Sequence, residues 1–230
     1  MKKLLFLIIC IPTLSFSQSV SAVTDTKSAN PGEVIDQLPL PPPKLEGTFY
    51  LNEDWVEGDL WLKNQKVLRG FPLKYDLKNQ LLEIKTEYGI KVCQLPLIEK
   101  FVIKQPLKDS IHYYNTSVVN NITFDVPKGI CEILVNDKVK VIKYQYMEIK
   151  EATYNVALSA GERNDKVLKK DKHYVIVRDQ VFELKNKVKK NDEVFGQKTS
   201  EVEAFAKKNN LKLKDDAEII KVFEYYNSLI

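Results

Sequence analysis

Short runs of alternating apolar and polar residues, separated by polar turns, most constrain what this chain can fold into. Leu60 and Leu62, and likewise Leu82 and Ile84, lie two residues apart with Trp61 and Glu83 between them, which is in part the period of two of a half-buried strand and not the three-to-four spacing of a helix. Comparable runs recur along the chain, and we expect strands at 48–51, 59–62, 71–75, 81–85, 90–93, 101–103, 130–135, 139–146, 154–158, 173–177 and 181–184.

A four-residue turn motif separates several of these runs. The sequence Leu-Lys-Asn-Gln occupies positions 62–65 and again 77–80, and looser forms occupy 135–138, 177–180 and 184–187. Asn or Asp, the third residue of each, tolerates a left-handed backbone and can bond its own chain, which a tight hairpin connection requires. The motif therefore predicts a hairpin at each of the five positions.

After residue 190 the apolar spacing becomes helical. Ser200 and Glu203 have the spacing of a capping box, and Asp215 precedes a second stripe of apolar residues that ends at Ile230. We predict an α+β, mainly β fold: an antiparallel, curved or barrel-like meander over 47–190, with two C-terminal helices over 191–230 packed on it in the same domain.

The first 46 residues have a different character. Met1-Lys2-Lys3, an apolar run and small residues before position 18 have the form of a secretory signal cleaved after Ser17, with Cys10 discarded. Prolines crowd the end of the segment 18–46, which favours a flexible, Pro-rich leader. We therefore expect an exported protein, located in the periplasm or outside the cell.

The charge balance limits the classes of partner. Removal of Lys2 and Lys3 with the signal leaves 33 basic against 31 acidic residues, a net charge of +2. This near-neutral balance argues against a nucleic-acid partner, and no later apolar run has membrane-spanning length. The segment 163–190 is locally basic; an anionic partner is one interpretation, and lysine-rich strand edges that discourage aggregation are the favoured one.

Two cysteines, Cys93 and Cys131, remain after signal removal. In an exported chain an even pair is a disulfide candidate. Two buried thiols that behave as apolar side chains are the alternative, and the sequence leaves both open.

No catalytic constellation is present. His112 and His173 lack a carboxylate at a recognised spacing, and the chain has no phosphate-binding glycine loop, paired-cysteine motif or zinc-binding helix. We therefore predict a non-enzymatic protein with no cofactor, no metal and no catalytic residue.

Two clusters of side chains between residues 50 and 61 are candidate binding sites, one for a calcium ion and one for a sugar or a peptide. Four carboxylates surround Gly58 and suggest calcium, although a solvated acidic hairpin is the favoured interpretation: Glu53, Asp54, Glu57 and Asp59. Aromatic residues also gather there, and Tyr50, Trp55 and Trp61 are our candidates for a binding surface. Aromatic residues on an outer face form a platform for a sugar or a peptide, but core positions are the commoner use.

Three short motifs have the form of glycosylation acceptors. Asn115 and Asn121 begin N-glycosylation sequons, and Asp109-Ser110-Ile111 has the form of an O-glycosylation acceptor. We expect all three matches to be accidental.

The chain resembles a group of uncharacterised exported β-rich proteins of Gram-negative bacteria. The resemblance rests on Ser15-Phe16-Ser17-Gln18, on Tyr50, Trp61, Leu68, Gly70, Leu73, Tyr75 and Leu82, and on Tyr225-Tyr226-Asn227. It implies a β-rich fold with C-terminal helices and no assigned activity. These relatives have Asn-Gly or Asp-Gly in turns where this chain has Asn-Gln, which affects the expected turn type.

The first functional hypothesis is an exported, non-enzymatic protein that binds a ligand or partner through its sheet. The alternative is a structural or assembly component of the cell envelope, and an enzyme of unrecognised type is the third. A binding module should have an apolar cavity or exposed aromatic residues, whereas a structural component should have a filled interior. The identity of the partner and the oligomeric state are not predicted.

Overall fold

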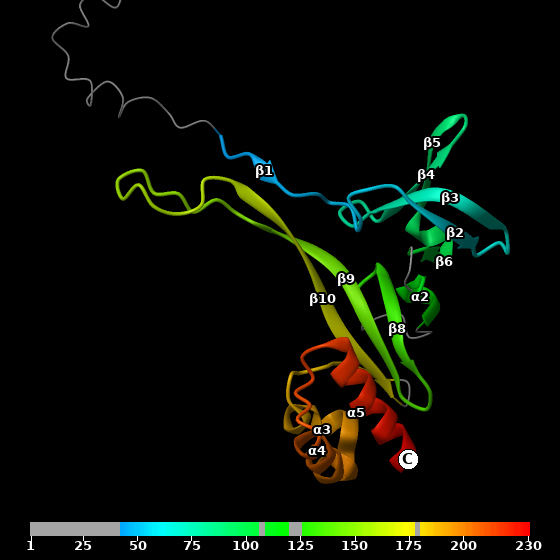
Figure 1. Cartoon of the computed structure of the whole chain (residues 1–230), viewed down its shortest axis with the longest axis vertical. Helices are drawn as coiled ribbons and strands as arrows, with labels where there is room; N and C mark the ends of the chain where they lie inside the picture. The colour runs from blue at the N-terminus through cyan, green and yellow to red at the C-terminus, as the bar shows by residue number, and fades with distance from the viewer. Residues whose placement is uncertain (1–41, 106–108, 120–125, 178–179) are drawn as a thin grey trace, which may run out of the picture. The chain divides into compact units, whose positions relative to one another are not determined.

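The computed structural model describes residues 42–105, 109–119, 126–177 and 180–230 (Figure 1). The expected signal peptide, the leader up to residue 41, Asn121 and two residues of the fourth turn motif lie outside these ranges. The described strands are β1 (Leu45–Glu46), β2 (Val56–Leu62), β3 (Val67–Asp76), β4 (Leu81–Thr86), β5 (Gly89–Gln94), β6 (Ile98–Ile103), β7 (Ile111–Asn115), β8 (Ile130–Asn136), β9 (Lys140–Lys150), β10 (Asp165–Val177) and β11 (Gln180–Glu183).

These strands form one mainly antiparallel sheet that is not closed into a barrel. Its order is β1-β10-β9-β8-β7-β6-β2-β3-β4-β5, with β11 also paired to β10. The fold is therefore mainly β, but the expected simple meander is interrupted. After β5 the chain returns through a short turn, η1 (Leu95–Leu97), and β6 pairs with β2. As a result β5 is left at the edge of the sheet.

The turn motif predicted the position of a hairpin correctly at 62–65, 77–80 and 135–138, and it predicted the turn mechanism only in part. Positions 62–65 and 77–80 do connect β2 to β3 and β3 to β4, and 135–138 connects β8 to β9. The left-handed residues, however, are the fourth ones, Gln65 (φ 67°) and Gln80 (φ 54°), and not the asparagines. The hairpin predicted at 184–187 is wrong, because buried Asn191 binds the backbone of Lys185 and Lys187 and leads the chain into a helix.

Several predicted strands are corrected. Residues 48–51 contribute only an isolated bridge, from Tyr50 to Asp76, and residues 154–158 form a turn closed by a bridge from Asn155 to Ala160. Strand β7, which carries His112, was not among the predicted strand ranges. The predicted leader 18–46 ends in a strand, because β1 pairs in parallel with β10, with Leu45 opposite Asp165.

The described helices are α2 (Thr116–Val119), η2 (Val188–Asn191), α3 (Asp192–Phe195), η3 (Gly196–Lys198), α4 (Thr199–Lys208) and α5 (Asp216–Leu229). The two long C-terminal helices are therefore confirmed, and α3 is an additional short one. Asp215 caps α5 as predicted, its side chain accepting a hydrogen bond from the Glu218 amide. The capping box at Ser200 is wrong, because α4 already begins at Thr199 and no side chain caps it.

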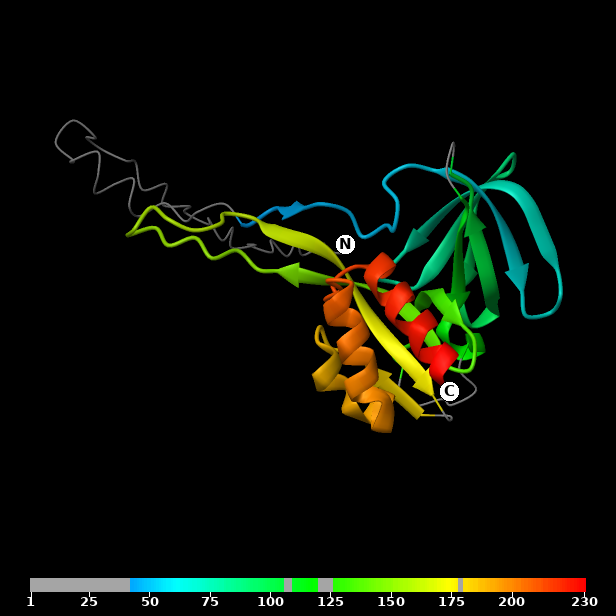
Figure 2. The same cartoon turned by 60° about the horizontal axis from the view of Figure 1, so that its bottom comes forward.

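The helices cover one face of β8, β9 and β10. Figures 1 and 2 both show α4 and α5 side by side against the end of β10. The apolar stripe of α5, which includes Ile219, Val222 and Phe223, packs on Val141 and Val175 of the sheet, and we call this cluster the helix-side core. Full burial of each such side chain contributes about 1.5–3 kcal/mol, so the stripe decides where α5 packs.

A second cluster, the N-terminal core, lies against β2–β7 and is centred on Leu60, Tyr75 and Phe101. Its aromatic rings stack, with centroids 5.5 Å apart for Tyr75 and Phe101 and 5.1 Å apart for Phe101 and Tyr113. A third, smaller cluster is formed by Cys131, Ile142, Tyr144 and Tyr174.

Gly58 allows β2 and β6 to approach closely. A Cβ atom at this position would lie 2.2 Å from the carbonyl oxygen of Val102, and the β2–β3 register shifts directly after Gly58. Only glycine fits this contact without moving a strand.

Among the helices in the described ranges, none is both long enough and apolar enough to cross a membrane.

Candidate functional site: the outer face and free edge of the sheet

The outer face is the side of β2–β7 turned away from the N-terminal core. Lys74 of β3 lies opposite Glu83 of β4, and Glu83 lies opposite Val92 of β5, so these residues form one row across three strands. Residues two apart on a strand share a face, which places Ile90 beside Val92. The outer face therefore continues without interruption to the edge strand.

Tyr50 and Trp55 belong to this face, where both are half-buried. The ammonium group of Lys74 lies 4.4 Å from the Tyr50 ring centroid and 5.9 Å from that of Trp55. The Tyr50 hydroxyl donates to Glu83 Oε1 at 2.9 Å, and this hydrogen bond, together with burial, raises the pKa of Tyr50. A cation over an aromatic ring is worth about 0.5–1 kcal/mol at an exposed site, so the pairs hold the rings in position.

Trp61 lies in a separate aromatic cluster of the outer face. It is opposite Lys100 of β6, which is opposite Tyr114 of β7. The Lys100 ammonium lies 4.6 Å from the Trp61 centroid and 5.7 Å from the Tyr114 centroid, and Arg69 approaches Trp61 from 5.8 Å. The structure therefore brings Tyr50 and Trp55 together but not Trp61 with them.

The preference for core positions was wrong for these three aromatic residues. Tyr50, Trp55 and Trp61 are all half-buried on the outer face. It was correct for Tyr75, which is fully buried, and in part for Phe71, which packs against the N-terminal core. Tyr50, Trp55 and Trp61 therefore lie on the outer face, and their role in binding stays a prediction.

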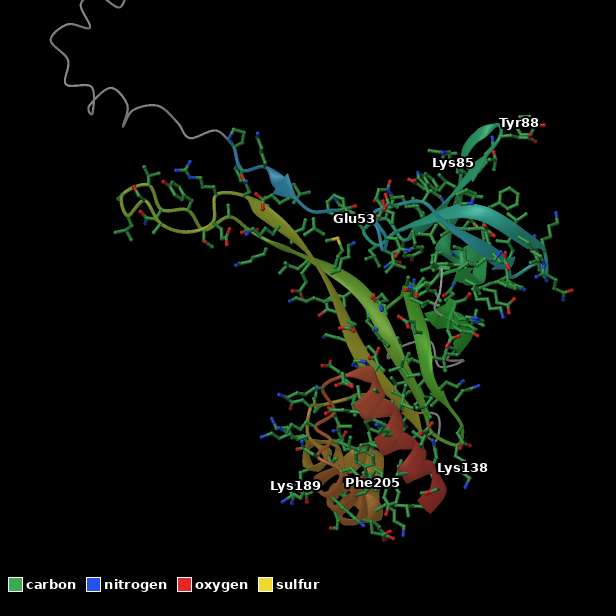
Figure 3. The ribbon with its side chains drawn as sticks, in the orientation of Figure 1. Glu53, Lys85, Tyr88, Lys138, Lys189 and Phe205 are labelled. Atoms are coloured by element: carbon green, nitrogen blue, oxygen red, sulfur yellow. The ribbon has the colours of Figure 1, made fainter. Side chains whose placement is uncertain are left out.

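Strand β5 presents the most exposed apolar surface of this face. Tyr88 is 81% exposed, and Ile90 and Val92 are each 56% exposed. Figure 3 shows Tyr88 at the tip of the β4–β5 hairpin, with Lys85 nearby on the same hairpin. In the described part of the chain, β5 pairs with β4 alone, so its other side presents backbone amides and carbonyls in a row.

This edge lacks the usual devices that block further pairing. Natural edge strands are often short, interrupted by proline, bulged or rich in lysine. Strand β5 is six residues long, has no proline and no register shift against β4, and contains a single charged residue, Lys91. Sequence reasoning identified the strand but not the edge, because its position depends on the return of β6 to β2.

The acidic cluster does not form a cation site. Glu57 and Asp59 both pair with Lys104, at 2.7 and 3.5 Å, and Asp59 also accepts a hydrogen bond from the Gly70 amide. The other two carboxylates, on Glu53 and Asp54, are exposed. The favoured interpretation, an acidic hairpin, agrees with this geometry.

A second titratable cluster links the sheet to α5. Its members come from four elements: Glu132, Lys143, Asp171, His173 and Asp216. Asp216 is the centre, since its carboxylate lies 2.8 Å from His173 Nε2 and 2.8 Å from Lys143 Nζ. Sequence reasoning missed it because 43 residues separate His173 from Asp216.

Ligand atoms of Asp171, His173 and Asp216 lie within 4.8 Å of one another, which is close enough to share a metal ion. The ammonium group of Lys143 already pairs with both carboxylates, at 3.7 and 2.8 Å. The Lys143 ammonium thus already occupies this cluster. We interpret the cluster as a set of ion pairs that attaches α5 to the sheet.

The pKa values of the cluster agree with this interpretation. Burial opposes ionisation of Asp216, yet its hydrogen bonds with Lys143 and His173 keep its pKa below the ordinary value. Burial dominates at Glu132, whose pKa is raised despite the nearby Lys143. The cluster therefore favours the charged form of Asp216 in particular.

The remaining polar candidates are structural or exposed. His112 is exposed on β7. Asn115 is buried, where its amide donates to the carbonyls of Leu95 and Ile98, so the folded chain cannot present this sequon. Ser110 is exposed.

Both cysteines are free and buried. Cys93 belongs to the N-terminal core and Cys131 to the third cluster, and no disulfide joins them in the structure. Burial raises the pKa of both thiols, that of Cys131 to about 12. The geometry matches the alternative of two apolar-behaving thiols.

The basic segment 163–190 is neutralised only in part where it is described. Lys166 pairs with Glu162, Lys170 with Glu148, and Lys172 and Lys185 with Glu183. These pairs are exposed and contribute little individually. They agree with the favoured interpretation of charged strand edges.

Comparison with protein-family models, with curated proteins and with solved structures found no match. The resemblance to uncharacterised exported proteins therefore stays a prediction.

Proposed function

We propose that this protein is a non-enzymatic, exported binding protein that adds an extended segment of a protein partner to strand β5. The observation that carries the proposal is the free edge of β5, with Ile90 and Val92 exposed beside it. An extended backbone satisfies a row of edge amides and carbonyls, and alternate side chains of the added strand then meet the apolar face.

The aromatic residues extend the same binding surface. An added strand would continue the outer face beyond Val92. Val92 lies in the same cross-strand row as Glu83 and Lys74, and Lys74 contacts the rings of Tyr50 and Trp55. A partner segment with apolar residues at every second position would contact Ile90 and Val92, and Tyr88 could cover its end. Export after cleavage at Ser17 would place this interaction outside the cytoplasm.

Photo-crosslinking in the native cell envelope tests the proposal. A photoreactive amino acid replaces Tyr88, and adducts are compared for the otherwise unchanged chain, for Ile90→Lys with Val92→Lys, and for Ile149→Lys. Ile149 is the matched control, because it is an exposed apolar strand residue on β9. We expect a discrete adduct that the edge lysines abolish and the control lysine leaves unchanged.

The outcome that contradicts the proposal is a yield of adduct that does not depend on the edge lysines. Circular dichroism and the urea midpoint verify that the variants fold, since lysine at exposed strand positions adds no buried charge. Amide exchange gives a second readout, because partner binding should slow exchange in β5 and not in β9.

A structural or assembly component is the second candidate, favoured by the stacked rings of Tyr75, Phe101 and Tyr113 in the N-terminal core. In that case the partner strand would be β5 of another copy. The same experiment separates the two: an adduct of twice the chain mass indicates self-assembly, and an adduct of another mass indicates a different protein.

A further inference from the structure

A groove of about 410 Å³ lies between η2, α4 and the connection from α4 to α5. It is in the helical part of the chain, away from the edge strand on which the proposed function rests. Its lining residues fall into an apolar floor and a charged rim. The floor consists of Val188, Ala206, Leu211 and Leu213.

The floor is firmly held. Val188, Ala206 and Leu213 are buried members of the helix-side core, and Leu211 packs against it. The amides of Lys212 and Lys214 both donate to Glu218 Oε2, at 3.2 and 2.9 Å, which fixes the connection against the first turn of α5. The groove is thus formed by the fold itself and needs no rearrangement to open.

The rim has a strong excess of positive charge. Five lysines line the groove against one carboxylate, that of Glu203: Lys187, Lys189, Lys207, Lys212 and Lys214. Glu203 is already shared by Lys189 and Lys207, at 3.6 and 2.8 Å. Among the described residues, no carboxylate lies within ion-pair distance of the other three lysines. Figure 3 shows Lys189 projecting outward from this part of the chain.

We propose that this groove binds a single-chain anionic amphiphile, a medium-chain fatty acid being the simplest, with its alkyl chain on the apolar floor and its carboxylate among the lysines. The charge complementarity selects an anionic head group, and the apolar floor selects an alkyl tail. The volume is in the lower part of the range of small-molecule sites, which fits one short chain.

The rival interpretations predict different binding. Exposed lysines alone would attract any anion, including a short acidic peptide. An apolar floor alone would accept an alkyl chain with any head group. Only a combined site requires both the charge and the chain in one molecule.

Titration followed by amide chemical shifts tests the proposal on the mature protein. The probes are decanoate, decanol, decyltrimethylammonium, acetate and a hepta-aspartate peptide, each below its aggregation concentration. We expect decanoate to shift the amides of Val188 and Leu213 and to bind at least about tenfold more tightly than decanol, with affinity that falls as salt is added.

A charge variant identifies the head-group site. Lys212→Gln with Lys214→Gln should weaken decanoate binding by about threefold to tenfold, the range for two exposed charge contacts, and should leave decanol binding unchanged. Lys221→Gln is the matched control, since this exposed lysine of α5 does not line the groove. Both substitutions replace exposed side chains, so the fold is retained.

Three results would overturn the proposal. The first is equal binding of decanoate, decanol and decyltrimethylammonium, which would leave the lysines without a role. The second is a response to hepta-aspartate without one to decanoate, which would assign the groove to an acidic polypeptide. The third is the absence of shifts at the floor amides with every probe.

Discussion

Asn227 joins the last turn of α5 to the β8–β9 hairpin through both atoms of its amide. Its Oδ1 accepts a hydrogen bond from the Val139 amide at 2.9 Å, and its Nδ2 donates to the Val139 carbonyl at 3.2 Å. Both residues are buried. Lys138, labelled in Figure 3, marks this hairpin beside the end of α5. Replacement of Asn227 by Leu keeps the volume similar and leaves two buried backbone groups without partners.

The expected loss of stability follows from that count. A buried polar group left without a partner costs about 1–3 kcal/mol, so the two groups together cost about 2–6 kcal/mol. The whole free energy of unfolding of a domain is only about 5–15 kcal/mol. With a urea dependence of about 2 kcal/mol per molar, the unfolding midpoint should fall by about 1–3 M.

Urea unfolding followed by circular dichroism measures this difference. Glu224→Leu is the matched control, because Glu224 is an exposed residue of the same helix and its replacement should change stability by no more than about 0.5 kcal/mol. A loss below about 0.5 kcal/mol for Asn227→Leu would refute the reasoning, since it would mean that the hairpin backbone finds other partners.

Four further predictions concern individual buried or charged residues. Gly58→Ala should lower the free energy of unfolding by about 1–3 kcal/mol or more, because the added Cβ would clash with the backbone of β6. Urea unfolding measures this loss, and an unchanged midpoint would contradict the close approach of β2 and β6. Tyr75→Phe should be neutral or stabilising, since no partner of this buried hydroxyl is found among the described residues, and a clear loss would reveal one. Asp216→Asn should destabilise the fold at neutral pH, because folding lowers the pKa of Asp216. The stability that the ionised carboxylate contributes is present above the ordinary pKa of 3.8 and is lost as the pH falls through the folded-state pKa. The urea midpoints of the unchanged chain and of the variant should therefore converge below about pH 4. Cys93 and Cys131 should react with a thiol reagent only after unfolding, and two thiols should titrate without reductant; fewer than two would indicate a disulfide.

Local sequence patterns were enough to place most of the strands and the two long helices. Period-two alternation found the strands from β2 to β6 and from β8 to β11, and helical spacing found α4 and α5. The failures occurred where the structure depends on a partner. Residues 154–158 were predicted as a strand, yet they lie in the connection between β9 and β10, where the described residues offer only the bridge from Asn155 to Ala160.

The candidate site was predicted only in part, for a related reason. Tyr50, Trp55 and Trp61 were found because large aromatic side chains are conspicuous in a sequence. The edge position of β5, the pairing of His173 with Asp216 and the lysine rim of the groove all depend on contacts between distant segments. Such contacts follow from topology, which periodicity along the chain does not encode.

The return of the chain from β5 to β2 also determines which edges of the sheet are open. Strands β2 to β5 precede β6 in the sequence, so these four strands alone would form a sheet with two open edges, β2 and β5. In the folded protein the pairing of Leu60 with Phe101 covers the β2 edge, so that of these two edges only β5 stays open in the described part of the chain.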